Sequence, residues 1–113
     1  MPTRQYTPKQ GDIVWLDFDP SSGREIMKRR PAYVISQKVF NAHTELAIVA
    51  PITSVIRGIK LEVVLPKGLS TVGAILLHQL KSIDFSYRNI EYIETAPKDI
   101  IKQARQVIHV ITG

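Results

Sequence analysis

The stretch Arg30-Pro31-Ala32-Tyr33-Val34-Ile35 places a proline at the start of a short apolar run. Proline has no N–H to offer a sheet ladder, so it fits the start of a strand or an edge strand. An earlier run, Ile13-Val14-Trp15-Leu16-Asp17-Phe18, is separated from it by a loop rich in Arg and Lys. Short runs of Val, Ile and aromatic residues between turn residues are typical of strands. This region therefore predicts two β-strands joined by a basic loop, with Trp15 and Tyr33 packed in the core.

Working outward, further apolar runs with turn residues between them continue the strand pattern. Asn41 to Thr44 is interpreted as a turn, and Pro66 to Gly68 as the stop of another strand. The expected strands are Leu46–Ala50, Leu61–Leu65, one long strand over 73–83, and 89–94. Five or six short strands of this kind favour a small SH3-like antiparallel barrel or curled sheet, a mainly β fold.

Near the end of the chain, the spacing of the apolar residues changes from that of strands to that of a helix. Apolar residues recur at the spacing of one helical face: Ile100, Ile101, Ala104, Val107, Ile108 and Ile111. Pro97 suits a first helical turn, and Asp99 favours the positive end of the helix dipole. We expect one C-terminal amphipathic helix that covers an open end of the barrel. Alternatively, its apolar face helps to bury a subunit interface.

Composition limits the possible functions. The 113 residues carry 15 Lys and Arg against 10 Asp and Glu, a net charge of +5, and no cysteine. A single domain over 1–113 is expected, with residues 1–10 as a flexible segment. The charge favours a polyanionic partner, and the lack of cysteine excludes disulfides and a thiol nucleophile. Since neither a signal peptide nor an apolar run of membrane-spanning length is apparent, we expect a cytoplasmic protein without a membrane partner.

Arg30 is the leading candidate for a functional group. The fixed backbone of Pro31 would aim its guanidinium, which can hold a phosphate with two hydrogen bonds. As isolated features, a basic loop is usually solvated and Thr53 is an ordinary strand residue. His43, His78 and His109 are possible acid–base groups, but they share no close spacing. No clustered His or Asp arrangement predicts a metal site, and no cofactor is expected.

The order of these segments resembles the MazF/PemK family of toxins, also called mRNA interferases. The resemblance rests on the run from Gly11 to Pro20, on Gly23-Arg24-Glu25, on the 30–36 and 51–54 stretches and on Gln79-Leu80-Lys81-Ser82-Ile83. It covers about 11–113. It implies an SH3-like barrel with a C-terminal helix, a homodimer, a small acidic antitoxin as partner, and metal-independent cleavage of single-stranded RNA.

The same resemblance assigns roles to individual residues. Arg30 matches the family's catalytic arginine, Thr53 its strand-ending threonine, and Glu25 the acidic residue of a loop motif. That motif here reads Gly23-Arg24-Glu25-Ile26-Met27, without the usual serine and glutamine, and His78 replaces a common acidic residue. Glu25 is the first candidate for the general base and His78 the alternative. Expected RNA contacts are Arg24, Lys28, Arg29, Arg57, Lys60, Lys81 and Gln79, with Tyr33, Phe40 or Trp15 as possible stacking surfaces.

Chemistry supports a ribonuclease, because RNA supplies its own nucleophile in the 2′-OH. The protein must align that oxygen, move two protons and stabilise a charged phosphorane. The expected products are a 2′,3′-cyclic phosphate and a 5′-OH. Two other functions stay open from the sequence: a CcdB-like toxin that binds DNA gyrase and cuts nothing, and an inactive member that only binds RNA or antitoxin.

Overall fold

The computed structural model describes residues 6–18 and 29–113. Seven strands of these residues form one antiparallel sheet in the order β4-β5-β3-β2-β1-β7, with β6 paired to β3. The elements are β1 (Asp12–Asp17), β2 (Arg29–Val34), α1 (Lys38–Thr44), β3 (Ala47–Thr53), β4 (Glu62–Val64), β5 (Ala74–Leu76), η1 (Leu77–Gln79), β6 (Lys81–Ile83), η2 (Phe85–Tyr87), β7 (Glu91–Thr95) and α2 (Lys98–Thr112). The predicted mainly β fold, a curled antiparallel sheet with a C-terminal helix, is confirmed.

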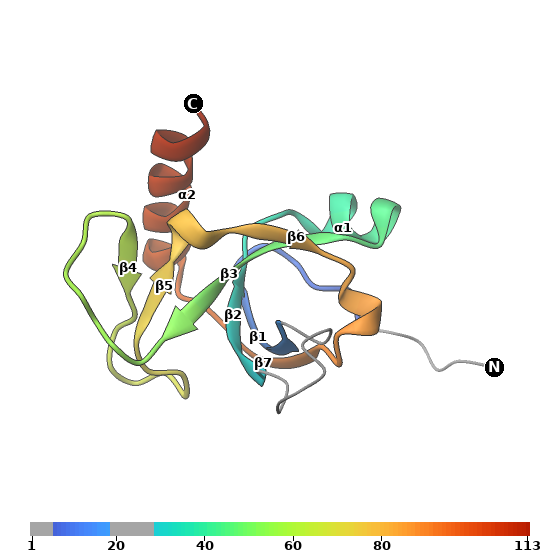
Figure 1. Cartoon of the computed structure of the whole chain (residues 1–113), viewed down its shortest axis with the longest axis horizontal. Helices are drawn as coiled ribbons and strands as arrows, with labels where there is room; N and C mark the ends of the chain where they lie inside the picture. Colours follow the sequence, from blue (N-terminus) through green and yellow to red (C-terminus); the bar gives the residue numbers. More distant parts are fainter. Residues whose placement is uncertain (1–5, 19–28) are drawn as a thin grey trace, which may run out of the picture.

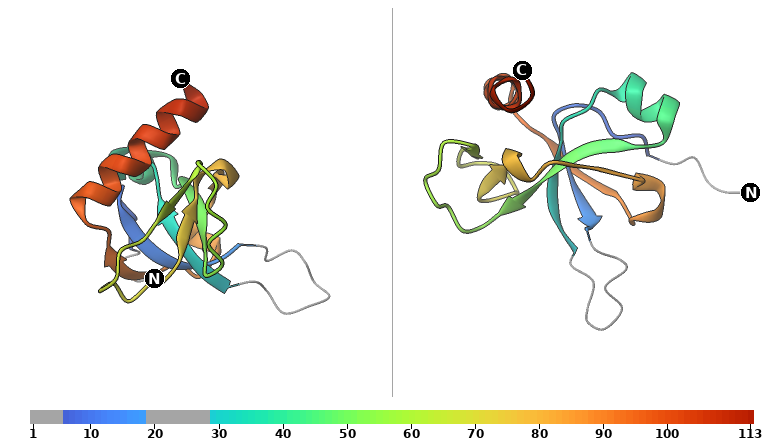
Figure 2. Two further views of the ribbon diagram at one scale, coloured as in Figure 1. Left: turned by 90° about the vertical axis from the view of Figure 1, so that its left-hand side faces the viewer. Right: turned by 45° about the horizontal axis from the view of Figure 1, so that its top comes forward.

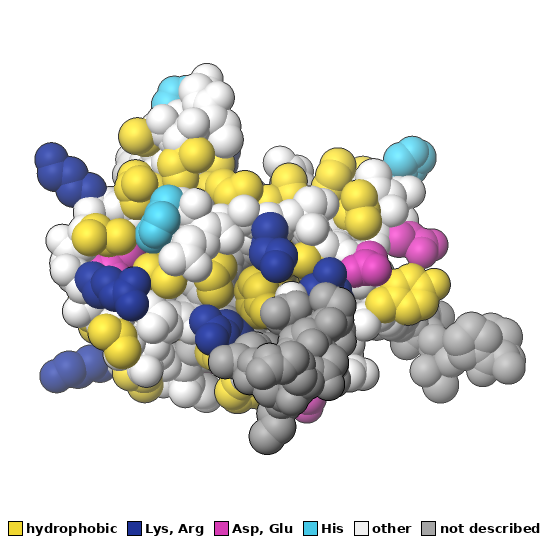
Figure 3. Space-filling model, viewed as in Figure 1, with side chains coloured by type: hydrophobic (Ala, Val, Ile, Leu, Met, Phe, Trp, Pro, Cys, Tyr) yellow, Lys and Arg dark blue, Asp and Glu magenta, His cyan; other side chains and the backbone are white. Residues whose placement is uncertain are grey.

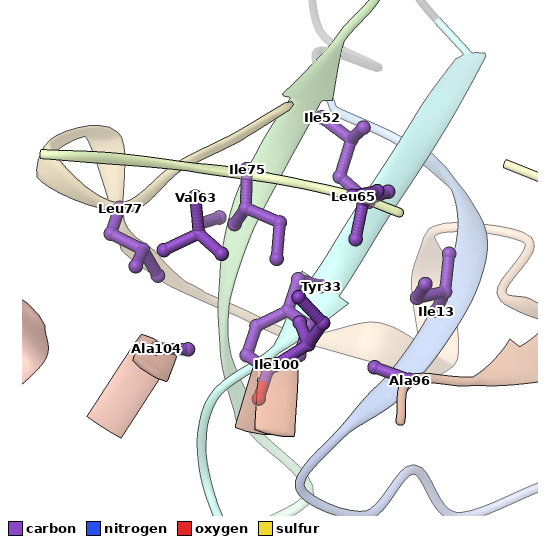
Figure 4. Close-up of a cluster of buried hydrophobic side chains, with 11 residues drawn as sticks. Ile13, Tyr33, Ile52, Val63, Leu65, Ile75, Leu77, Ala96, Ile100 and Ala104 are labelled. Carbon is purple, nitrogen blue, oxygen red and sulfur yellow. The ribbon is translucent and has the colours of Figure 1, made fainter. Parts of the chain in front are cut away.

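Strands β1 and β2 have buried residues on both faces, which explains their continuous apolar runs. Successive residues of a strand point to opposite sides of the sheet. Ile13 and Tyr33 lie in one core cluster and Val14 and Ala32 in the other. Figure 4 shows the first cluster, in which Tyr33 lies among side chains from the sheet and from α2. Tyr33 is buried as predicted.

Helix α2 covers one end of the sheet, as predicted. Ile100 and Ala104 are buried in the first core cluster, and Ile101, Val107 and Ile108 pack against it. Pro97 is the N-cap residue, directly before the first turn. Figure 1 shows α2 beside β4 and β5, with α1 at the far side of the molecule, and the right-hand view of Figure 2 shows the same separation.

Helix α1 corrects the interpretation of Asn41 to Thr44 as a turn, and it makes α2 one of two α-helices among the described residues. The Asn41 side chain is fully buried and donates to the Pro8 carbonyl at 2.8 Å and to the Ser36 carbonyl at 3.2 Å. Tertiary hydrogen bonds of this kind stabilise a helix too short to form alone. They were invisible in the sequence, because Pro8 is distant along the chain.

Three further expectations differ from the structure. The strand expected over 73–83 is divided into β5, the 3₁₀ turn η1 and β6, and β3 pairs with both strands. Trp15, expected in the core, is 39% exposed. Residues 6–10, part of the segment expected to be flexible, are held by contacts: Tyr6 donates to Asp12, and Gln10 donates to the Ile35 carbonyl.

Candidate active site

The candidate site begins where β2 and β3 separate. Their recorded pairing covers 32–34 of β2 and ends at the pair Ala32–Pro51. Pro31 precedes Ala32 in β2 and has no N–H with which to extend the ladder toward β3. On the opposite edge of β2, Pro31 still pairs with Trp15 of β1. Beyond that pair, Ile52 and Thr53 of β3 pair with β5 on the far side. Pro31 and Pro51 therefore mark the point at which β2 and β3 cease to be paired.

Arg30 and Thr53 meet at this point. Extending the β2–β3 register by two residues places Arg30 opposite Thr53, on the same face of the sheet. Both line a cavity of about 300 Å³, whose other lining residues are Arg29, Pro31, Ile52, Ser54 and Val72. The two residues that the sequence singled out for catalysis thus come together in one hollow. Their catalytic roles stay predictions.

The Thr53 hydroxyl has a defined orientation. Its oxygen accepts a hydrogen bond from the backbone N–H of Val55 at 3.1 Å. A hydroxyl has one proton and two lone pairs. With one lone pair used as acceptor, the Thr53 hydroxyl keeps a proton that can be donated to a ligand.

Arg29 is held by hydrogen bonds to β1, to β7 and to Asn89, which precedes β7. Its guanidinium donates to the buried Asp17 at 3.2 Å, to the Asn89 carbonyl at 2.8 Å and to exposed Glu91 at 3.0 Å. Asp17 also accepts from the Asn89 side chain at 2.7 Å. None of the hydrogen bonds among the described residues involves the guanidinium of Arg30. Both arginines line the cavity, but they differ: the guanidinium of Arg29 is bound to the scaffold, and that of Arg30 makes no hydrogen bond to another described residue.

Loop 54–61 carries two of the expected RNA contacts, Arg57 and Lys60. It is fixed by Glu62, which is only 7% exposed. One carboxylate oxygen of Glu62 accepts from the backbone N–H groups of Arg57 at 3.1 Å, Gly58 at 2.6 Å and Ile59 at 3.3 Å. The Arg57 and Lys60 residues stay exposed. Their cations are therefore carried on a positioned loop close to Thr53 in the chain.

Other predicted site residues lie apart from the cavity or outside the described residues. His78 and Gln79 are exposed on η1 and do not line the cavity. Lys81 begins β6, with its ammonium 5.5 Å from the centre of the Phe18 ring. Arg24, Glu25 and Lys28 belong to 19–28, outside the described residues. The described residues hold no group of three His, Asp or Glu side chains placed to share a metal ion.

One face of the molecule carries more basic than acidic side chains, which suits a polyanion. Figure 3 shows several Lys and Arg side chains across the face seen in Figure 1, with the acidic ones fewer. No helix of the described residues is long and apolar enough to cross a membrane.

Comparison with known proteins identifies the family. The model of the PemK-like, MazF-like toxins of type II toxin–antitoxin systems matches residues 9–112. This chain belongs to that family. It is 34% identical to the endoribonuclease toxin MazF of Escherichia coli K12, over 96% of this chain and 97% of that protein. It is 31% identical to the endoribonuclease EndoA of Bacillus subtilis, over 88% and 91% of the two chains.

Solved structures agree with this assignment. The crystal structure of MazF from Deinococcus radiodurans matches with a TM-score of 0.84 and 36% identity, covering 95% of this chain and 97% of that one. A MazE–MazF structure from the same organism matches with a TM-score of 0.84 and 33% identity, covering 96% and 98%. The predicted resemblance to MazF/PemK toxins is confirmed.

Several residues that shape the site had no signal in the sequence. Val72 follows a run of ordinary loop residues, yet it lines the cavity. Asp17 and Glu62 look like exposed acidic residues inside strand patterns, but both are buried. Their partners are distant in the chain or are backbone N–H groups, and neither kind of contact can be read from residue spacing.

Proposed function

We propose that this chain is an endoribonuclease, the toxin of a type II toxin–antitoxin system, and that it cleaves single-stranded RNA without a metal ion. The observation that carries the proposal is the cavity that Arg30 and Thr53 share, in a chain that belongs to the MazF-like toxins. By this activity it would inhibit translation and growth.

The proposed reaction uses the 2′-OH of the RNA as nucleophile. That oxygen attacks the adjacent phosphorus, and the bond to the leaving 5′-oxygen breaks. The products are a 2′,3′-cyclic phosphate and a 5′-OH. Arg30 stabilises the added negative charge of the phosphorane with its fixed positive charge, and the Thr53 hydroxyl donates to a nonbridging oxygen. DNA lacks the 2′-OH and would bind without being cut.

The proton transfers need further groups. Arginine is a poor base, because its pKa lies above about 12. We assign the general base to Glu25, with His78 as the alternative. Arg24, Lys28, Arg57, Lys60, Lys81 and Gln79 are proposed to contact the RNA, whose phosphates attract cations on exposed loops. Arg29 is also proposed to contact the RNA, although its guanidinium already contacts Asp17 and Glu91.

The proposed partners follow from the family. A structure of a MazE–MazF complex is among the matches, which supports a small acidic antitoxin as partner of this basic chain. We also propose a homodimer. Val110 and Ile111 near the end of α2 are 74% and 38% exposed, so apolar surface is left for an interface. We also propose a cytoplasmic location, because the proposed substrate, mRNA, is translated there.

One experiment tests the proposed reaction. Purified protein is incubated in EDTA with a long unstructured RNA, with the all-DNA version of that sequence, and with an RNA that carries 2′-deoxy substitutions at the mapped cuts. Discrete cuts of RNA alone are expected, with cyclic-phosphate ends in mass spectra. Arg30→Ala should lose cleavage. Lys98→Ala, which removes one exposed cation at the start of α2, should retain it.

The outcomes separate the alternatives. Cutting that requires Mg²⁺, or that survives Arg30→Ala, contradicts the mechanism. Inhibition of gyrase supercoiling without RNA cleavage would support a gyrase-binding toxin. RNA or antitoxin binding without either activity would support an inactive member of the family.

A further inference from the structure

Glu94 joins two regions that are far apart in the sheet order. It lies on the edge strand β7, whereas the loop 65–73 connects β4 and β5 at the other end of the sheet. Its carboxylate oxygens accept from the backbone N–H of Ser70 at 3.0 Å and of Thr71 at 2.8 Å. These bonds connect the two ends of the curled sheet, which are not joined by a strand ladder of the described residues.

The loop held by Glu94 reaches the candidate active site. Thr71 is 6% exposed, but the next residue, Val72, is 75% exposed and lines the cavity with Arg30 and Thr53. Gly73 follows with a φ of +130°, and a Cβ there would lie 2.0 Å from the Thr53 carbonyl oxygen. The loop backbone therefore packs closely against Thr53 at Gly73 and is hydrogen-bonded to Glu94 at Ser70 and Thr71. Val72 lies between these two attachments.

A single exposed valine is ordinary on a protein surface, but Val72 is distinguished by lining the cavity together with Arg30 and Thr53. A well-solvated loop gains nothing from an apolar side chain at 75% exposure. Beside a nucleotide, the same side chain is covered by ribose or base and loses its contact with water, which favours binding. Such a wall works best when the loop is already ordered, because ordering it during binding would cost affinity.

We propose that Glu94 is a positioning residue of the RNA site. Through the amides of Ser70 and Thr71 it holds Val72 as an apolar wall against the nucleotide beside the scissile phosphate. This role rests on the proposed ribonuclease function. Glu94 touches neither the RNA nor the reacting atoms; it acts through Val72.

The test measures steady-state cleavage of a short fluorescent RNA that contains one mapped cut. The variants are Glu94→Gln, Val72→Ala and their double substitution. Gln keeps the side-chain length but turns one acceptor oxygen into an NH₂ donor, which cannot accept from an amide. Glu45→Gln is the matched control, since it removes the same charge at the end of α1, away from the cavity. Thermal unfolding establishes that each variant is folded.

We expect KM to rise about threefold to tenfold for Glu94→Gln and for Val72→Ala, with kcat within about twofold of wild type. Glu45→Gln should match wild type. If Glu94 acts through Val72, the double variant should show a smaller rise than the product of the single effects. A purely structural role would instead lower the unfolding temperature without this coupling in KM.

The results distinguish failure of the positioning role of Glu94 from failure of the proposed ribonuclease function. If wild type cuts RNA and Arg30→Ala does not, but the Glu94 and Val72 variants keep the wild-type KM, the positioning role is wrong and the nuclease stands. The positioning role is equally wrong if the two KM effects multiply independently. If wild type does not cut RNA, the proposed function fails and the role of Glu94 in it fails with it.

Discussion

The guanidinium of Arg29 donates from Nη1 to the buried Oδ1 of Asp17 at 3.2 Å, and its Nη2 donates to Glu91 at 3.0 Å. Asp17 and Arg29 are paired in the β1–β2 register, so the contact joins the last residue of β1 to the first residue of β2. Because side chains alternate along a strand, fixing Arg29 on one face leaves Arg30 on the other. The network thus fixes the guanidinium of Arg29, although both arginines line the cavity.

Asp17→Asn should lower the free energy of unfolding by about 1–3 kcal/mol, because Arg29 loses a buried charged partner. Urea unfolding followed by circular dichroism measures this. Glu91→Gln is the control: its side chain is 69% exposed, and an exposed pair contributes less than about 1 kcal/mol. Equal losses for the two variants would contradict a special role for Asp17.

The sequence was sufficient to predict those structural features that depend on residues close together in the chain. Short apolar runs between turn residues predicted most of the strands, and the spacing from Ile100 to Ile111 predicted α2. The pairing of Arg30 with Thr53 followed from the family resemblance and agrees with the register beyond Ala32–Pro51. These features depend on residues close in sequence or on a recognised order of motifs.

Features that depend on distant contacts were not predictable. Helix α1 is stabilised by Asn41 bonding to Pro8, and Trp15 is exposed although it lies inside an apolar run. The break at η1 was hidden because 73–83 contains no proline, and apolar residues stand on both sides of the polar pair His78 and Gln79. Glu62 and Glu94 bind backbone N–H groups of loops, and no residue type marks such an acceptor site.

Thr53→Val should reduce kcat for RNA cleavage by about tenfold to a thousandfold, because one donor to the phosphorane is lost. Thr53→Ser keeps the hydroxyl and should retain most of the activity. Single-turnover cleavage in EDTA compares the two variants with wild type. Equal activity of the Val and Ser variants would remove the Thr53 hydroxyl from the mechanism.

Gly73→Ala should be far more damaging than Gly68→Ala. Both glycines have positive φ, +130° and +103°, so both substitutions introduce backbone strain of about 1–3 kcal/mol. Only at Gly73 would the new Cβ also meet backbone, 2.0 Å from the Thr53 oxygen. We expect a larger fall in unfolding temperature and a loss of cleavage for Gly73→Ala, and cleavage retained for Gly68→Ala. Similar effects on cleavage would mean that the loop does not support the cavity.

Tyr33→Phe should leave stability unchanged or raise it by up to about 1 kcal/mol. The Tyr33 hydroxyl is buried, and no group among the described residues hydrogen-bonds to it. Burial raises the pKa of this phenol to about 12, opposed in part by the positive charge of Arg105. Removing the oxygen relieves an unpaired polar group while the ring keeps its packing. A loss of more than about 1 kcal/mol in urea unfolding would reveal a partner for the hydroxyl.

The contribution of Glu94 to stability should depend on pH. Burial acts to raise the pKa of this carboxyl, but hydrogen bonds from Ser70 and Thr71 outweigh it and hold the pKa below its usual value. Because the folded state favours the ionised form, the stabilisation is present at neutral pH. It is lost as the pH falls through the unfolded pKa and then the folded one.

The measurement is the difference in unfolding free energy between wild type and Glu94→Gln, taken from about pH 7 down to about pH 3.5. Other carboxyl groups titrate in both proteins and largely cancel. Wild type should be the more stable at neutral pH, and the difference should shrink in acid, where a protonated Glu94 resembles Gln. A difference that stays constant or grows in acid would contradict the carboxylate as the group that holds the loop.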